Sequence, residues 1–224
     1  DMNIQNKSSK NSLEFKSIDY QLQPYTNPEL IKENGPQVFR SGSGVKVKDI
    51  DGNSYIEGMS GLWCASLGFN ENELVEAAIT QMKKLPFYHS FTGKTCESTI
   101  NLSEKLIEIA PNNLKKIFFC NSGSEANDTA IKIVWYYHAS LGNPQKRKII
   151  SRKGSYHGVT LAAASLTALE YAQKGFSLPL DFAIHTTCPH YFQNSNENES
   201  EKDFCNRLVS DLEELIKHEG AENI

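Results

Sequence analysis

The segment Lys115–Leu141, KKIFFCNSGSEANDTAIKIVWYYHASL, decides the expected fold. Its first part, Lys115–Cys120, has the apolar pattern of a buried strand, Asn121–Ser124 is typical of a tight turn, and Glu125–Leu141 has helical periodicity. A further apolar run at Lys148–Ser151 predicts a second strand. A strand, a helix and a strand in this order predict a right-handed parallel βαβ unit, and therefore an α/β fold.

The turn between the first expected strand and its helix is a candidate anion site. The free amides and the dipole of a helix N-terminus favour a negatively charged ligand. Gly123 would let a phosphate approach the backbone, and the hydroxyl groups of Ser122 and Ser124 could donate hydrogen bonds to it. The same residues also fit a capping box, with Ser122 as the N-cap and Glu125 three residues later. Spacing alone leaves both interpretations open.

A second polar cluster, Gly154–Gly158 with the sequence GSYHG, follows the second expected strand. In an open parallel sheet, ligands bind outside the carboxyl ends of neighbouring strands, so the two clusters are expected to meet over one crevice. The ring of Tyr156 could stack on a planar cofactor, and the flanking glycines leave room for it. The alternative is a Tyr-His pair in an ordinary tight turn.

The remaining expected elements follow from local periodicity and turn residues. Residues 1–26 are polar and are expected to be irregular. Asn70 is expected to be the N-cap of a helix that ends before Pro86. Strands are predicted at Val38–Arg40, Val45–Lys48, Ser54–Glu57 and Ala183–Thr186, and further helices at Glu97–Ile109, Val159–Leu169 and Glu201–His218.

Composition narrows the function classes. The 224 residues contain 23 Lys plus Arg and 27 Asp plus Glu, a net charge of −4, which argues against a nucleic-acid-binding surface. No apolar stretch approaches the roughly 20 residues that cross a bilayer, so no membrane partner is expected. The five cysteines form no C-x-x-C pair and are interpreted as reduced thiols in the cytoplasm. No metal site is expected, because His185, Cys188 and His190 lack a second ligand pair.

Several motifs together resemble one enzyme family, the class III pyridoxal-phosphate aminotransferases. The resemblance extends from about Tyr25 onward and is strongest to the omega-amino acid:pyruvate branch. The matching motifs are Phe118–Asn127 with Lys132, Ser155–Gly158, Asp51–Asn53 with Gly61–Trp63, Phe87–Phe91 and Cys188–Tyr191.

The resemblance implies a fold-type I transferase that acts as a homodimer. Residues 1–65 would form an N-terminal extension and a β-rich small-domain segment, and residues 66–224 the first part of the large, mostly parallel-sheet domain. The cofactor, pyridoxal 5'-phosphate (PLP), would be bound by six residues with distinct roles. Its phosphate would be held by Ser122, Gly123 and Ser124, its ring would stack on Tyr156, and that wall would be shaped by His157 and Gly158.

The resemblance also implies a substrate pocket with aromatic walls. The pocket would be lined by Tyr25, Leu62 and Trp63, and by Phe87, Tyr88 and Phe91 from a loop near the dimer interface. From composition alone, Trp63 fits a core position as well as a site. Such walls suit amines as well as ω-amino acids, and the amino group would pass to a keto acid such as pyruvate in a ping-pong reaction.

No residue of this chain matches the family's Schiff-base lysine, which the resemblance places beyond Ile224. The chain is therefore expected to be the N-terminal half of a transaminase, inactive by itself. A different class of function is a non-catalytic remnant that binds the cofactor phosphate or takes part in dimerisation. A third is a nucleotide-binding α/β domain, for which the helix N-terminus would serve equally well; Tyr156 argues against it.

Overall fold

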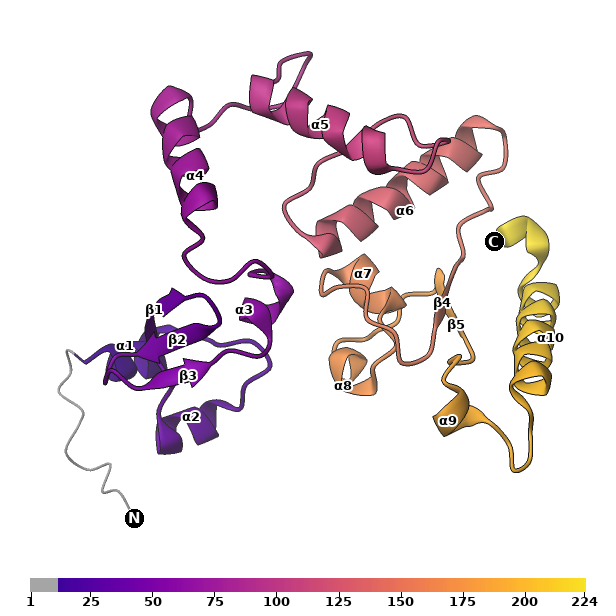
Figure 1. Ribbon diagram of the computed structural model, residues 1–224. Coiled ribbons are helices and arrows are strands. Elements are labelled where there is room, and N and C mark those ends of the chain that lie inside the picture. The colour runs from indigo at the N-terminus through magenta and orange to yellow at the C-terminus, as the bar shows by residue number, and fades with distance from the viewer. Residues whose placement is uncertain (1–11) are drawn as a thin grey trace. The chain divides into compact units, whose positions relative to one another are not determined.

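The computed structural model describes residues 12–224 and is drawn in Figure 1. Its contacts group into two compact units, residues 1–101 and residues 102–224, which are described separately below. The expected division after residue 65 falls inside the first unit and stays a prediction about the domains of the whole fold. Within residues 12–224, no helix is both long and apolar enough to span a membrane.

The first unit contains a three-stranded antiparallel sheet in the order β1-β2-β3. The strands are β1 (Phe39–Ser43), β2 (Lys46–Asp49) and β3 (Ser54–Ile56), which confirms the β-rich segment expected from the sequence. Val47 and Asp49 of β2 are buried while Lys46 and Lys48 are exposed, as the alternating pattern predicts.

The buried carboxylate of Asp49 holds the turn between β2 and β3. It accepts hydrogen bonds from the amides of Asp51 and Asn53, from the side-chain amide of Asn53 and from the hydroxyl of Tyr55. These donors, with the Asn53 side chain the strongest, lower the pKa of Asp49 below its usual range. The turn that leads toward Glu57 is therefore fixed by one carboxylate.

The expectation that the chain is irregular up to residue 26 is wrong for the described part. Helix α1 (Leu13–Tyr20) begins at Ser12, whose Oγ accepts a hydrogen bond from the Phe15 amide. Helix α2 (Pro28–Asn34) begins at Asn27, with proline at its first position. Both starts are ordinary N-caps that the polar composition of the segment hides. Residues 1–11 lie outside the described part.

Two longer helices follow in the sequence after α3 (Ser60–Trp63), which belongs to the candidate site. Helix α5 (Glu97–Ile109) has the predicted bounds. Helix α4 (Asn72–Lys84) is also confirmed, but Asn70 is not its N-cap. Asn70 has φ of 58°, a left-handed conformation that asparagine tolerates, and the cap position falls on Glu71. Neither helix has a buried residue.

The second unit contains a two-stranded parallel sheet. Strand β4 (Ile149–Arg152) pairs with β5 (Ala183–Thr186), with Ile149 opposite Ala183. The crossover carries α7 (Leu161–Leu166) and α8 (Glu170–Gln173) in place of the single helix expected at residues 159–169. Helix α7 ends early because Thr167 is extended, and its buried hydroxyl bonds to the preceding loop instead.

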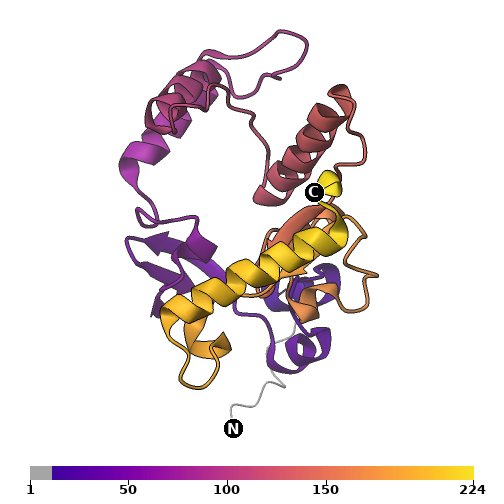
Figure 2. The same ribbon diagram turned by 90° about the vertical axis from the view of Figure 1, so that its right-hand side faces the viewer.

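Helices lie on both sides of this sheet. Helix α6 (Gly123–Ser140) contributes Ile131 to a small core with Leu166 of α7 and Ala183 of β5. Helix α10 (Glu201–Glu219) contacts β5 and crosses in front of the sheet in Figure 2. The Thr187 hydroxyl, just after β5, donates to the Asp211 carboxylate of α10 at 2.7 Å. The loop that follows β4 reaches the N-terminus of α6, where the Val159 amide donates to Ser124 Oγ.

The strand expected at Lys115–Cys120 is wrong. This segment forms no regular element and pairs with no strand among residues 12–224, and Phe118 is 71% exposed. A strand exists only through hydrogen bonds to a neighbouring strand, whereas the apolar pattern reflects only local sequence. The observed parallel unit therefore runs from β4 through α7 and α8 to β5.

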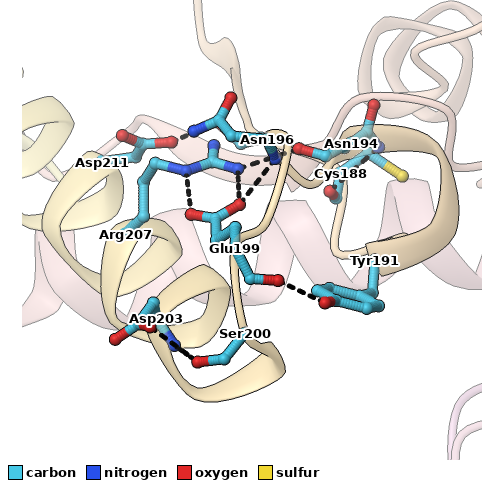
Figure 3. A network of polar contacts seen from close by, with 10 residues as sticks. Cys188, Tyr191, Asn194, Asn196, Glu199, Ser200, Asp203, Arg207 and Asp211 are labelled. Atoms are coloured by element: carbon cyan, nitrogen blue, oxygen red, sulfur yellow. Dashed lines mark hydrogen bonds and ion pairs between the residues drawn. The ribbon is translucent and has the colours of Figure 1, made fainter.

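A polar network joins α9 (Tyr191–Asn194) to α10 and the loop between them (Figure 3). The guanidinium of Arg207 donates to both carboxylate oxygens of Glu199, at 2.8 and 2.7 Å, and to the carbonyl of Asn194 at 2.8 Å. The Glu199 carbonyl also accepts from the Tyr191 hydroxyl. Arg207, together with the Asn196 amide, lowers the pKa of Glu199 to about 2.

Replacing Arg207 with Ala is expected to lower the midpoint of urea unfolding at pH 7, because the half-buried Glu199 loses its bidentate partner. The folded-state pKa of Glu199 is depressed, so this stabilisation is present in full above the usual glutamate value of 4.5 and is lost as pH falls toward about 2. The difference between the two proteins should therefore shrink over that range. Lys202→Ala, an exposed cation on the same helix, is the control; an equal effect there would contradict the network's role.

Candidate functional site

The N-terminus of α6 is built by a capping arrangement. Ser122 is the N-cap and its Oγ accepts from the Glu125 amide at 3.1 Å. The Glu125 carboxylate turns back and accepts from the Asn121 amide at 2.9 Å. The capping interpretation is therefore confirmed, and it is compatible with the expected anion site. The amides of Gly123 and Ser124 find no acceptor in the described part of the chain, and nothing lies within 4 Å of a Cβ placed on Gly123.

The loop after β4 reaches this helix N-terminus, which confirms that the two clusters meet. The Val159 amide donates to Ser124 Oγ at 3.0 Å, and the side-chain amide of Asn127 donates to the His157 carbonyl at 2.6 Å. Gly158, with φ of 133°, allows this approach. A Cβ at that position would lie 2.5 Å from Ser124 Oγ and 2.9 Å from Ser124 Cα. Only glycine fits there without moving the backbone.

Two further residues hold the same loop, and sequence reasoning assigned them no role. Asp128 Oδ1 accepts from the Thr160 hydroxyl at 2.8 Å and from the Ala163 amide at 2.9 Å, which ties α6 to the start of α7. The fully buried Thr167 accepts from the His157 amide at 2.8 Å and donates to the Gly158 carbonyl at 3.1 Å. Asp128 lies one turn after Ser124, a helical spacing that could have pointed to it. Thr167 has no such signal.

The groups left free at this helix N-terminus suit a ligand that has both an anionic group and a planar ring. Ser122 Oγ and Ser124 Oγ both act as acceptors for amides, so each hydroxyl hydrogen is free to donate. The Tyr156 side chain is exposed at 57%, next to the fixed His157 and Gly158 backbone. The residues expected to bind phosphate and a ring are thus gathered at one place in the second unit.

The expected pocket residues belong to the first unit, and all of them are exposed. Tyr25 lies between α1 and α2, while Phe87, Tyr88 and Phe91 share the loop between α4 and α5. The ring of Tyr88 stacks on His89, with centroids 4.7 Å apart. Trp63 is 75% exposed, so it does not take the core position that composition also allowed.

Leu62 and Trp63 lie in an unusual backbone turn. All four residues of α3 have positive φ: 51° at Ser60, 58° at Gly61, 57° at Leu62 and 68° at Trp63. This is a left-handed helical turn, closed by the Trp63 amide donating to the Met59 carbonyl at 2.8 Å. Left-handed conformation costs about 1–2 kcal/mol for each residue other than glycine, so the turn persists only where other contacts hold it.

One such contact comes from a residue that sequence reasoning did not single out. The Glu57 carboxylate accepts from the Met59 amide through Oε1, at 3.1 Å, and from the Gly61 amide through Oε2. The ring of Phe69 lies close to this turn and to β1: a Cβ placed on Gly61 would lie 3.5 Å from it, and one placed on Gly42 would lie 2.9 Å from it. Left-handed Leu and Trp have no sequence signature, so the turn could not be predicted.

Comparison with known proteins gives close matches over nearly the whole chain. A "Gamma-aminobutyrate transaminase 1, mitochondrial" from Oryza sativa subsp. japonica is 45% identical over 204 residues, which are 91% of this chain and 40% of that protein. A "Vanillin aminotransferase" from Capsicum frutescens is 47% identical over 84% of this chain and 41% of its own length. This chain thus spans less than half the length of these relatives.

Solved structures agree with these relatives. The omega transaminase from Pseudomonas jessenii in complex with PMP has a TM-score of 0.93 at 51% identity, covering 95% of this chain and 47% of that chain. A PMP-bound aminotransferase from Vibrio fluvialis has a TM-score of 0.93 at 41% identity, covering 97% of this chain and 48% of that chain. The mixed α/β architecture is accordingly that of a fold-type I transferase.

The family assignment follows from the extent of the match. The family model described as "Aminotransferase class-III" matches residues 31–224, which include every residue of both loops at the N-terminus of α6. Because this match covers far more than half of the sequence, the chain belongs to the class-III aminotransferase family.

Proposed function

We propose that this chain forms the cofactor-phosphate side of a PLP-dependent transaminase that moves an amino group from an amine or ω-amino acid to a keto acid such as pyruvate. The observation that carries the proposal is the junction of Gly158 with Ser124, which joins the two motifs of this family into one donor-lined site. The chain spans less than half of its relatives' length, so the activity proposed is that of a protein that also contains the remaining part.

The residues present fit the cofactor. The open space beside Gly123, the free amides of Gly123 and Ser124 and the hydroxyls of Ser122 and Ser124 together suit a phosphate dianion. When bound, PLP supplies the electron sink for transamination. This chain would bind the phosphate and place the Tyr156 ring against the cofactor ring. Its Asn127 and Asp128 side chains would hold the segment from Tyr156 to the start of α7 in place.

The aromatic residues of the first unit support a broad amine specificity. The exposed side chains of Leu62, Trp63, Phe87 and Phe91 offer apolar surface that suits a hydrophobic donor. The relatives carry names that refer to gamma-aminobutyrate and vanillin, an aliphatic and an aromatic compound. Because vanillin is an aldehyde without an amino group, its name refers to an aromatic amino acceptor, and the proposal therefore includes aliphatic and aromatic substrates.

We also propose that the protein is a cytoplasmic homodimer. All five cysteines of the chain are free, which suits a reducing compartment. The exposed apolar side chains of α4, among them Leu74 and Met82, offer a surface for a second subunit. Light scattering of the purified protein tests the dimer, and cell fractionation tests the location.

The proposed activity predicts a defined kinetic pattern. With pyruvate as acceptor, a protein that contains this chain should transfer the amino group of β-alanine, gamma-aminobutyrate, a diamine or 1-phenylethylamine, and form alanine. Initial rates at several fixed pyruvate concentrations should give parallel double-reciprocal lines, as a ping-pong reaction requires. Reactions without pyruvate are the control. Intersecting lines, or no transfer from any donor, would contradict the proposal.

Replacing Ser124 with Asp should weaken PLP binding to the apoprotein by about a hundredfold or more, because like charges in contact cost several kcal/mol. Replacing Ser124 with Ala removes the hydroxyl but adds no charge and should cost about tenfold or less. Titrations followed by absorbance measure both affinities. Pyridoxal, which lacks the phosphate, is the control ligand and should bind both variants alike. If Ser124→Asp weakens pyridoxal and PLP equally, the phosphate does not bind at this helix N-terminus.

Replacing Gly158 with Ala should weaken PLP binding and lower the thermal midpoint together, because its Cβ would force the loop away from Ser124. Gly175→Ala is the matched control: Gly175 has φ of 85°, and nothing lies within 4 Å of a Cβ placed there. That variant carries only the conformational penalty of about 1–2 kcal/mol and should keep its PLP affinity. Wild-type affinity in Gly158→Ala would show that the junction of the two loops is not needed for the cofactor.

A further inference from the structure

Among residues 12–101, the left-handed turn Ser60–Trp63 is the longest run of consecutive residues with positive φ. Its four residues have positive φ, and only Gly61 adopts that conformation without a penalty. Strained segments of this kind persist where surrounding contacts over-determine them, and they cluster at ligand sites. Here the turn carries Leu62 and Trp63, which are 62% and 75% exposed and are therefore not held by burial of their side chains.

The carboxylate of Glu57 supplies a contact suited to this turn. Its two oxygens accept from the amides of Met59 and Gly61, on either side of Ser60. Both bonds need an acceptor, and a carboxylate offers two, whereas a glutamine side chain offers one acceptor oxygen and one donor group. Glu57 itself is fixed at the end of β3, where its amide donates to the Val45 carbonyl at 2.9 Å. The Glu57 side chain thus ties the turn to the end of β3.

We propose that Glu57 is a positioning residue that selects the amine donor by holding Leu62 and Trp63 in place through the left-handed turn. This inference rests on the proposed transaminase function. A large aromatic donor reaches an apolar wall that a small donor does not, so loosening the wall affects the two donors differently. In this proposal Glu57 acts through the backbone amides that it binds, and not by contact with the donor or the cofactor.

The test compares Glu57→Gln with wild type in two independent measurements. First, the protein is labelled with 5-fluorotryptophan; Trp63→Phe and Trp135→Phe assign the resonances of the two tryptophans in this chain. The Trp63 resonance should shift or broaden in Glu57→Gln while that of Trp135 stays unchanged. Second, kcat/KM for 1-phenylethylamine relative to β-alanine should fall by about tenfold, the lower end of what a change in pocket fit produces. This ratio is independent of the fraction of active protein.

Two further variants sharpen the comparison. Glu33→Gln, an exposed carboxylate of α2 outside the turn, should change neither measurement. Gly61→Ala places a Cβ at φ of 58° and disfavours the same turn, so it should move the Trp63 resonance and the donor ratio in the same direction as Glu57→Gln.

Each outcome decides the proposal. An unchanged Trp63 resonance in Glu57→Gln would overturn the positioning role. A shifted resonance with equal losses for both donors would overturn the link to donor selection. If the wild-type protein transfers no amino group, the proposed function fails, and the Trp63 resonance alone then decides whether Glu57 holds the turn.

Discussion

The contact between Gly158 and Ser124 is the constraint on which the candidate site depends. It brings the loop after β4 against the N-terminus of α6, and three side chains of that helix, Ser124, Asn127 and Asp128, fix the loop by hydrogen bonds. A side chain at residue 158 would separate the two segments, since its Cβ would lie 2.9 Å from backbone as well as 2.5 Å from a hydroxyl. Free donors and an exposed aromatic ring are gathered in one place because glycine stands there.

How much of the fold was predictable depends on whether an element is defined locally. The helices α5, α6 and α10 have bounds within two residues of the predicted ones, because periodicity, caps and breakers are properties of the segment itself. A strand also needs a partner, which is why the apolar run Lys115–Cys120 forms no strand, whereas the shorter run Ala183–Thr186 pairs with β4 as predicted. The helix expected at residues 159–169 ends early because Thr167 bonds to a loop that local sequence does not describe.

The same distinction between local and long-range features applies to the candidate site. The free amides at Gly123 and Ser124 could be predicted, because a turn followed by a helix leaves its first amides without partners. Asp128 and Thr167 act across separations of 9 to 35 residues, on partners that only the folded chain brings near. The left-handed turn at Ser60–Trp63 lies beyond sequence reasoning for another reason: its residues contradict their own conformational preference, and only contacts elsewhere make it stable.

The two units therefore position the side chains that are expected to bind ligands by opposite means. In the second unit a glycine removes a steric obstacle, and the helix and the loop meet without strain beyond the φ of Gly158 itself. In the first unit the backbone of Leu62 and Trp63 is held in an unfavourable conformation, and the carboxylate of Glu57 offsets part of that cost with two amide bonds. A strained turn relaxes once its restraint is removed, whereas an unstrained junction does not. Specificity is consequently expected to be more sensitive to substitutions around the turn than cofactor binding is to substitutions distant from Gly158.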